Sequence, residues 1–176
     1  MKIVKTKFKD LFIIKSKVYI DNRGFFREIF KKKLLNKYKF VFACASSSKK
    51  NVLRGLHFQS KFPQGKYLTV LKGEILDIAV DLRINSKTFG KHFKINLSEK
   101  NGKSIFIPPG FAHGFVGLKK ENTIVYFCTN YRSKYHEDGI LWNDSDLKIK
   151  WNIKKPILSK KDKKNKSFKE FKKIYA

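Results

Sequence analysis

The sequence predicts a mainly β protein, an antiparallel barrel or sandwich built from short strands. Apolar runs at residues 67–71 (YLTVL) and 75–80 (ILDIAV) are short and are separated by Lys72-Gly73, which is typical of strands joined by a turn. Glycines and aromatic residues are scattered along the chain, and helical periodicity is scarce. With 176 residues and 41% hydrophobic content, the chain can bury the core of one domain.

Three segments follow one another along this single expected domain. Residues 1–40 predict one or two N-terminal strands and a short helical piece at residues 31–38. Residues 41–150 contain the predicted barrel. Beyond Trp151 the sequence becomes polar, and residues 159–173 predict one or two short helices or a loose tail packed on the outside.

The N-terminal region and the cysteines favour a cytoplasmic protein. The apolar run at residues 11–14 (LFII) is too short for a signal-peptide core or a membrane span. Cys44 and Cys128 fit neither a disulfide framework nor a zinc motif, so we expect ordinary reduced thiols without a role.

Residues 51–66 gather the side chains that an anion-binding, proton-transferring site needs. Arg54, His57 and Lys66 lie close together in strand-like sequence. On a regular strand successive side chains alternate between the two faces, so Arg54 and His57 are expected to point to opposite sides. Alternation alone therefore does not bring both into one pocket.

Residues 102–113 (GKSIFIPPGFAH) combine a Pro-Pro-Gly turn with a histidine, His113, that follows it. The turn is tight, and the next segment is expected to direct His113 into the mouth of a barrel. The spacing resembles the second motif of cupins, in whose metal-dependent members this histidine binds a metal together with a His-x-His pair and a Glu. Here Gln59 stands two residues after His57, so we expect no metal and interpret His113 as a hydrogen-bond donor to substrate.

Further motifs extend along nearly the whole chain. They are RGFFRE (23–28), RGLHFQ (54–59) with QGK (64–66), GKSIFIPPGFAHGF (102–115), TNY (129–131) and ILWND (140–144). In this order and spacing they resemble the dTDP-4-dehydrorhamnose 3,5-epimerase family. The resemblance implies a cupin-type jelly-roll β-barrel and a cofactor-free epimerisation at C3 and/or C5 of a nucleotide-linked 4-keto sugar, for surface polysaccharides.

Epimerisation beside a ketone requires a base on one face of the sugar, an acid on the other and a positive group at the enolate oxygen. A histidine with a pKa near about 6.5 suits the base, and a tyrosine with a pKa near about 10 suits the acid. The resemblance assigns His57 as the base, Lys66 as the enolate-stabilising group and Tyr126 as the acid. It also assigns Asp162, in the segment LSKKD, as the carboxylate that orients His57.

The resemblance also implies substrate-binding residues from two subunits. Arg23 and Arg54 match arginines that bind phosphate or sugar. Phe26 and Glu28 match residues that reach the nucleotide of the partner subunit, in a homodimer formed by N-terminal strand exchange. The remaining expected substrate contacts are Gln59, His113 and Tyr131, the last of them near the site entrance.

One segment departs from the family pattern and leaves the substrate open. Residues 42–45 (FACA) stand where many members carry a polar Gln-x-Asn-type segment that contributes to substrate binding. Because hydrogen-bonding groups are lost there, a GDP-linked 4-keto heptose of a capsule pathway is a candidate beside a dTDP-linked 6-deoxyhexose. Two other classes also stay open: a non-catalytic cupin sugar-binding module, and an isomerase or dehydratase acting on 4-keto sugars.

The formal charge of +27 raises nucleic acid as a partner, because a strongly basic chain attracts phosphate backbones. Only 5 of the 41 basic residues are arginine, the residue that favours forked phosphate and base-edge contacts. The lysines are spread along the chain and crowd residues 154–173, as on a solvated surface. We therefore expect no specific nucleic-acid partner, and the same field would attract an anionic nucleotide diphosphate sugar.

Overall fold

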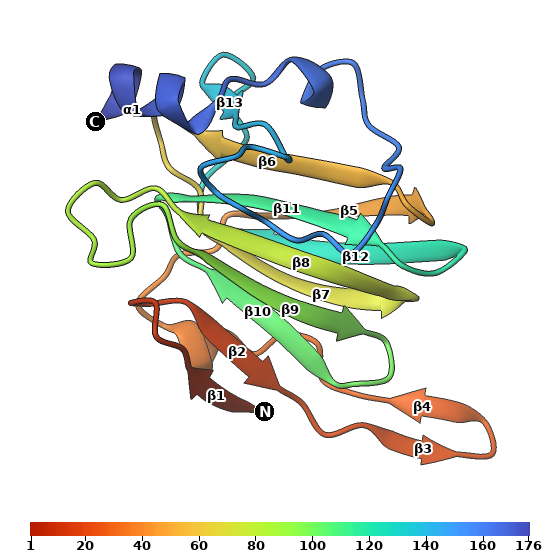
Figure 1. Cartoon of the computed structure of the whole chain (residues 1–176). Helices are drawn as coiled ribbons and strands as arrows, with labels where there is room; N and C mark the ends of the chain where they lie inside the picture. The colour runs from red at the N-terminus through yellow and green to blue at the C-terminus, as the bar shows by residue number, and fades with distance from the viewer.

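Two antiparallel sheets packed face to face form the body of the protein, and the computed structural model describes all 176 residues (Figure 1). The larger sheet has the order β1 (Lys2–Lys5), β2 (Phe12–Lys15), β10 (Lys103–Ile107), β7 (Lys66–Lys72), β12 (Glu121–Cys128) and β5 (Phe42–Lys49). The smaller sheet has the order β13 (Glu137–Gly139), β6 (Leu53–Gln59), β11 (Phe111–Gly117), β8 (Glu74–Asp81) and β9 (His92–Ser98). The predicted mainly β jelly-roll class is confirmed, although the sheets stay separate and do not close into one barrel.

The smaller sheet is buried on both faces, which explains why its strands are apolar without alternation. Its inner face packs against the larger sheet in a core that includes Ile75, Leu68 and Ile105. Its outer face is covered by the C-terminal segment, where Phe168 and Phe171 are 6% and 3% exposed. Burying an aromatic side chain of this size contributes roughly 1.5–3 kcal/mol, so the tail is an integral part of the fold.

The C-terminal segment contains two short helices, in line with the sequence analysis. They are the 3-10 helix η2 (Asp162–Lys164) and the α-helix α1 (Phe168–Tyr175). Helix α1 begins with a capping box, in which Ser167 and Glu170 each accept a backbone N–H of the other residue. None of the helices is long and apolar enough to cross a membrane.

Gly73 turns the chain from the larger sheet into the smaller one, between β7 and β8. Its φ is +81°, and a Cβ at this position would lie 2.1 Å from the carbonyl oxygen of Glu121. Only glycine fits such a backbone. The turn that the sequence predicts at Lys72-Gly73 is therefore a corner between the sheets.

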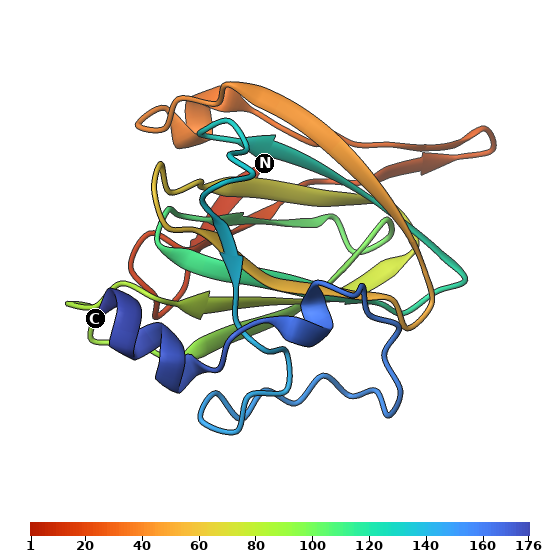
Figure 2. The ribbon, with the colours of Figure 1, turned by 90° about the horizontal axis from the view of Figure 1, so that it is seen from above.

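The N-terminal region differs from the expected division of the chain at residue 41. Strands β1 and β2 pair with each other and β2 pairs with β10, so both belong to the larger sheet. After them a hairpin of β3 (Tyr19–Asp21) and β4 (Gly24–Phe26) projects away from the two sheets (Figures 1 and 2). The expected helical piece at residues 31–38 is a single 3-10 turn, η1 (Lys32–Leu35).

Candidate active site

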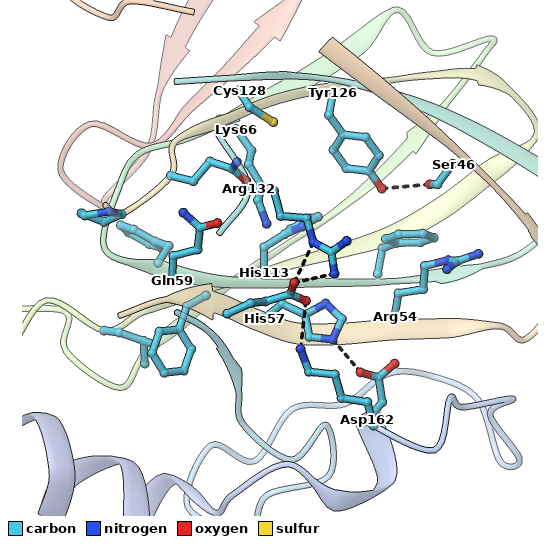
Figure 3. A pocket seen from close by; sticks show the side chains of 18 of the residues that line it. Ser46, Arg54, His57, Gln59, Lys66, His113, Tyr126, Cys128, Arg132 and Asp162 are labelled. Atoms are coloured by element: carbon cyan, nitrogen blue, oxygen red, sulfur yellow. Dashed lines mark hydrogen bonds and ion pairs between the residues drawn. The ribbon is translucent and has the colours of Figure 1, made fainter. Parts of the chain in front are cut away.

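A cavity of about 970 Å³ lies between the two sheets and the C-terminal segment. Figure 3 shows its polar side chains converging from several strands. Seven of the site residues expected from the sequence line it, namely Arg54, His57, Gln59, Lys66, His113, Tyr126 and Asp162. The tertiary structure thus brings together side chains that are far apart in the sequence.

A β-bulge brings Arg54 and His57 to the same cavity. Along β6, Arg54 lies opposite Phe115 of β11 and His57 lies opposite His113, so three steps on β6 match two on β11. An extra residue reverses the alternation of side chains beyond it. At Gly55 the φ is +132°, and a Cβ there would lie 2.5 Å from a backbone carbon of β11. The expectation from alternation, that Arg54 and His57 face opposite sides, is therefore wrong.

His57 is held by a buried carboxylate at the first residue of η2. Its Nε2 lies 2.5 Å from Oδ1 of Asp162, which is 3% exposed. Burial by itself raises the pKa of Asp162, but the hydrogen bond from His57 and that from Ser159 outweigh it, so the pKa lies below its usual value. The carboxylate is thus ionised at neutral pH, fixes the ring and leaves Nδ1 available to the cavity.

Tyr126 faces the cavity from the larger sheet, on the side opposite His57 (Figure 3). Its hydroxyl lies 3.2 Å from Oγ of Ser46 on the neighbouring strand β5. Burial raises the pKa of Tyr126 well above its usual value, and the hydrogen bond from Ser46 opposes this shift. Tyr126 therefore carries its proton at neutral pH.

Lys66 enters the cavity from β7, next to Tyr126 in the same sheet. Burial lowers the pKa of Lys66, while nearby acidic groups oppose the change. Its ammonium interacts with the nearby acidic groups only at longer range, without a side-chain hydrogen bond or ion pair. A cation without a protein partner in a cavity can stabilise a developing oxyanion.

A second histidine–carboxylate pair lies at the floor of the cavity, and the sequence pointed only to its histidine. Nε2 of His113 is 2.7 Å from Oδ2 of Asp77, which is fully buried on β8. The other carboxylate oxygen of Asp77 has no hydrogen-bond partner. A buried carboxylate fixes the orientation of the imidazole in the cavity wall.

The mouth of the cavity contains charged residues that no sequence motif marked. Glu137 accepts ion pairs from Arg132 at 2.6 Å and from Lys161 at 3.0 Å. Burial by itself raises the pKa of Glu137, but Lys161 and Arg132 lower it by a larger amount, so the pKa of Glu137 lies below its usual value. The two positive charges of Arg132 and Lys161 exceed the single negative charge of Glu137, so these three residues together carry a net positive charge at the mouth, near Asp162.

Gln59 lines the cavity, but its side-chain amide forms hydrogen bonds with the backbone of a surface loop. Nε2 donates to the carbonyl oxygens of Phe62 at 2.8 Å and Tyr131 at 3.3 Å, and Oε1 accepts from the N–H of Ser133 at 2.8 Å. The ring of Tyr131 stacks on Phe42 with centroids 5.8 Å apart, and Phe42 lines the cavity. Gln59 therefore holds the loop that carries Tyr131.

Cys44 and Cys128 also line the cavity. Cys44 belongs to residues 42–45, which the sequence analysis expected near the substrate, whereas nothing in the sequence indicated this location for Cys128. Cys44 is exposed on β5, whereas Cys128 is buried on β12 directly opposite Lys66. Burial raises the pKa of the Cys128 thiol to about 12. With Phe42 they give this wall of the cavity few hydrogen-bonding groups.

Three of the expected substrate-binding residues lie outside the cavity of their own chain: Arg23, and the two residues expected to reach the partner subunit, Phe26 and Glu28. The Arg23 side chain is 85% exposed and pairs with Asp21 at 2.6 Å, in the turn of the projecting hairpin. Phe26 is 67% exposed, and Glu28 pairs with Lys31 at 2.7 Å. This chain alone does not bring the three residues to its cavity.

A jelly roll with a histidine–aspartate pair, a protonated tyrosine and a free lysine around one cavity defines an enzyme that moves protons on a bound molecule. The family model described as dTDP-4-dehydrorhamnose 3,5-epimerase matches residues 5–170, and the chain belongs to this family. It is thus an isomerase that epimerises a nucleotide-linked 4-keto sugar.

Curated relatives and solved structures agree with this assignment. The dTDP-4-dehydrorhamnose 3,5-epimerase of Shigella flexneri is 45% identical over 92% of this chain and 93% of its own length. The crystal structure of the enzyme from Elizabethkingia anophelis is 43% identical, with a TM-score of 0.89 over 97% of both chains. The dTDP-6-deoxy-D-glucose-3,5-epimerase of Legionella pneumophila, solved with dTDP-4-keto-L-rhamnose, is 42% identical with a TM-score of 0.89, over 94% of this chain and 92% of its own.

Proposed function

We propose that His57 removes a proton beside the ketone of the substrate and that Tyr126 returns a proton to the opposite face of the same carbon. Lys66 stabilises the enolate oxygen between the two steps, and Asp162 stabilises the imidazolium of His57. The C–H bond breaks toward His57 and the new C–H bond forms from the Tyr126 hydroxyl, so the proton balance closes through solvent.

The single observation that carries this proposal is the placement of His57 and Tyr126 on opposite walls of one cavity. His57 belongs to the smaller sheet and Tyr126 to the larger sheet (Figure 3). Inversion of a carbon needs an acid and a base on its two faces, whereas binding alone needs neither. Lys66 is available between them as the cation for the enolate.

For substrate binding, the proposal assigns Arg54 to the diphosphate and His113 to the sugar. Arg54 lies at the cavity edge with part of its guanidinium free for an anion, the geometry that arginine offers to phosphate. Tyr131 lies by the entrance, beside Phe42.

We propose a dTDP-linked 4-keto-6-deoxyhexose as the substrate, since curated relatives are named dTDP-4-dehydrorhamnose 3,5-epimerase and one similar enzyme was solved with dTDP-4-keto-L-rhamnose. A GDP-linked 4-keto heptose for a capsule polysaccharide is the second candidate. It is favoured by one observation, the wall of Phe42, Cys44 and Cys128, which offers little hydrogen bonding to a sugar. Because a nucleotide diphosphate does not cross a bilayer unaided, we place the reaction in the cytoplasm.

NMR of each nucleotide sugar in D2O tests both the reaction and the substrate. We expect deuterium at C3, C5 or both, accompanied by inversion, with the dTDP-linked sugar. Exchange only with the GDP-linked sugar would replace the substrate, and exchange with neither would contradict the proposed function.

We propose a homodimer in which the projecting hairpin of one subunit completes the cavity of the other. The hairpin exposes apolar side chains that a monomer would leave in water, with Ile20, Phe25 and Phe26 at 80%, 51% and 67% exposure. Exposed apolar surface of this kind marks an interaction site. A two-fold symmetric exchange would bury both hairpins at once.

Mixing two inactive variants tests whether the hairpin serves the partner. His57→Asn retains its hairpin but lacks the base, and Phe26→Ala retains the base but lacks the hairpin ring. Because a mixed dimer pairs an intact hairpin with an intact cavity, we expect the mixture to regain activity that neither variant has alone. A mixture no more active than its components, or a monomeric protein in sedimentation analysis, would contradict the exchanged dimer.

The pH profile is expected to report the lowered pKa of Lys66. Its ammonium is present below this pKa and is lost as the pH rises through it, so epimerisation should decline at a lower pH than an ordinary lysine would give. The raised pKa of Tyr126 keeps that group protonated over the same range. If Lys66 causes the decline, the rate of solvent exchange in Tyr126→Phe should fall over the same pH range as in the wild type. If the decline is absent from Tyr126→Phe, the titrating group is Tyr126 and not Lys66.

Activity is expected to survive prolonged treatment with EDTA. Nε2 of His57 and Nε2 of His113 are each bonded to a carboxylate, and Gln59 stands where a metal-binding cupin has its second histidine. Rates before and after chelation and desalting measure the effect. Loss of activity that a single divalent ion restores would show that a metal takes part.

A further inference from the structure

Strand β5 lies at the edge of the larger sheet and contains three consecutive serines, Ser46, Ser47 and Ser48, of which Ser46 lines the cavity. It pairs with β12 in a regular antiparallel register, in which Ser46 lies opposite Ile124 and Ser48 opposite Asn122. Because side chains alternate along a strand, the hydroxyls of Ser46 and Ser48 point to the same side and that of Ser47 points away.

Each of the two inward hydroxyls contacts a different functional side chain. Ser46 Oγ lies 3.2 Å from the hydroxyl of Tyr126, the one side-chain hydrogen bond that this hydroxyl makes (Figure 3). Ser48 Oγ accepts a hydrogen bond of 3.0 Å from Nε of Arg54. Ser47 takes part through its main chain alone, since its carbonyl oxygen accepts 3.1 Å from Nη2 of Arg54.

We propose that Ser46 and Ser48 are positioning residues, which set the proton donor Tyr126 and the phosphate-binding Arg54 from a single strand. This inference rests on the proposed function and extends it to two residues that no motif marks. It assigns the two serines separable effects, one on proton delivery and one on nucleotide binding.

The effect of Ser46 follows from the charge that forms when Tyr126 gives its proton to carbon. The phenolate left behind lies in a buried wall, where an unsolvated anion is costly. The Ser46 hydroxyl can donate to that oxygen, and hydrogen bonds to an ionised group are stronger than those between neutral groups. Ser46 thus favours proton delivery more than it favours the resting hydroxyl.

The effect of Ser48 follows from the way Arg54 reaches across from the smaller sheet. Nε and Nη2 of Arg54 donate hydrogen bonds to Ser48 and Ser47 on β5, and these two bonds fix the plane of the guanidinium. Its remaining N–H groups are free to bind an anion. Ser48 is 5% exposed, and its carbonyl accepts from the side chain of Asn122, so the strand is anchored there. Loss of the Ser48 hydroxyl would release one edge of Arg54 and weaken phosphate binding.

Three alanine variants on this one strand test the inference, with inversion, solvent exchange and KM measured for each. We expect Ser46→Ala to lower inversion by about tenfold while exchange and KM stay near wild type. We expect Ser48→Ala to raise KM by about tenfold and to leave the ratio of inversion to exchange unchanged. Ser47→Ala is the matched control and should alter none of the three quantities, because its carbonyl remains.

Ser46→Thr keeps a hydroxyl and should restore the ratio that Ser46→Ala loses, which also provides a variant if the alanine form is unstable. An unchanged ratio in folded Ser46→Ala, or an equal loss in Ser47→Ala, would overturn the role of Ser46. An unchanged KM in Ser48→Ala would overturn that of Ser48. If the wild-type protein showed neither exchange nor inversion with any nucleotide 4-keto sugar, the proposed function itself would fail, and this inference with it.

Discussion

Replacing His57 by asparagine should abolish solvent exchange at both C3 and C5, a loss of about a thousandfold or more, within the range expected of a general base. Asparagine is shorter than histidine, and its amide does not extend to the position of Nε2, so Asp162 loses this partner. The carboxylate keeps its hydrogen bonds to Ser159 and to the backbone of Gly55, and we expect the fold to be preserved. The asparagine amide cannot accept a proton at neutral pH. The measurement is deuterium incorporation by NMR, followed separately at each carbon.

Nucleotide binding provides the control for this variant. Arg54 lies three residues before His57 but is held by β5, so titration calorimetry with the nucleoside diphosphate should give nearly the wild-type affinity. Asp162→Asn is the matched second variant and should reduce exchange less than His57→Asn, because the base remains and loses only its orienting anion. Deuterium incorporation at the wild-type rate in folded His57→Asn would remove His57 from the mechanism.

Replacing Tyr126 by phenylalanine should uncouple deprotonation from inversion. His57 and Lys66 remain, so the enolate still forms and the proton returns from the original face, which gives exchange with retention. Inversion should fall by about a hundredfold or more, as is typical of a lost general acid. NMR at C3 and C5 gives the ratio of inversion to exchange at each carbon.

The structural interpretation of Tyr126 makes a different prediction for the same variant. If the ring served only the core, loss of its hydroxyl would leave Ser46 without this partner and change stability by about 1 kcal/mol, with an unaltered ratio. An unchanged ratio at both carbons would assign the acid to another group or to water. A decline at one carbon alone would show that Tyr126 serves that carbon.

The sequence by itself determined the fold class and the kinds of side chain in the cavity. Short apolar runs and the Lys72-Gly73 turn between them are local features, which can be recognised along the chain. The sequence also placed His57 and Lys66 in strand-like segments, and the structure has them on β6 and β7. The substrate-contacting roles expected from them stay predictions.

Only the tertiary structure decided which side chains meet. The bulge at Gly55 depends on the pairing of β6 with β11, and it brings Arg54 to the side of His57 against the simple alternation of a strand. Three residues lie at the site only because their strands are next to it in space: Asp77, Ser46 and Glu137. None of them belongs to a sequence motif.

The tail illustrates the same division. Its polar sequence correctly predicts short helices on the outside, yet Phe168 and Phe171 anchor it over the smaller sheet and Asp162 contacts His57 across 105 positions of sequence. Hydrophobic periodicity is a property of neighbouring residues, and it can be read along the chain. Contacts between distant residues depend on how strands pair and sheets pack, and these are properties of the whole fold.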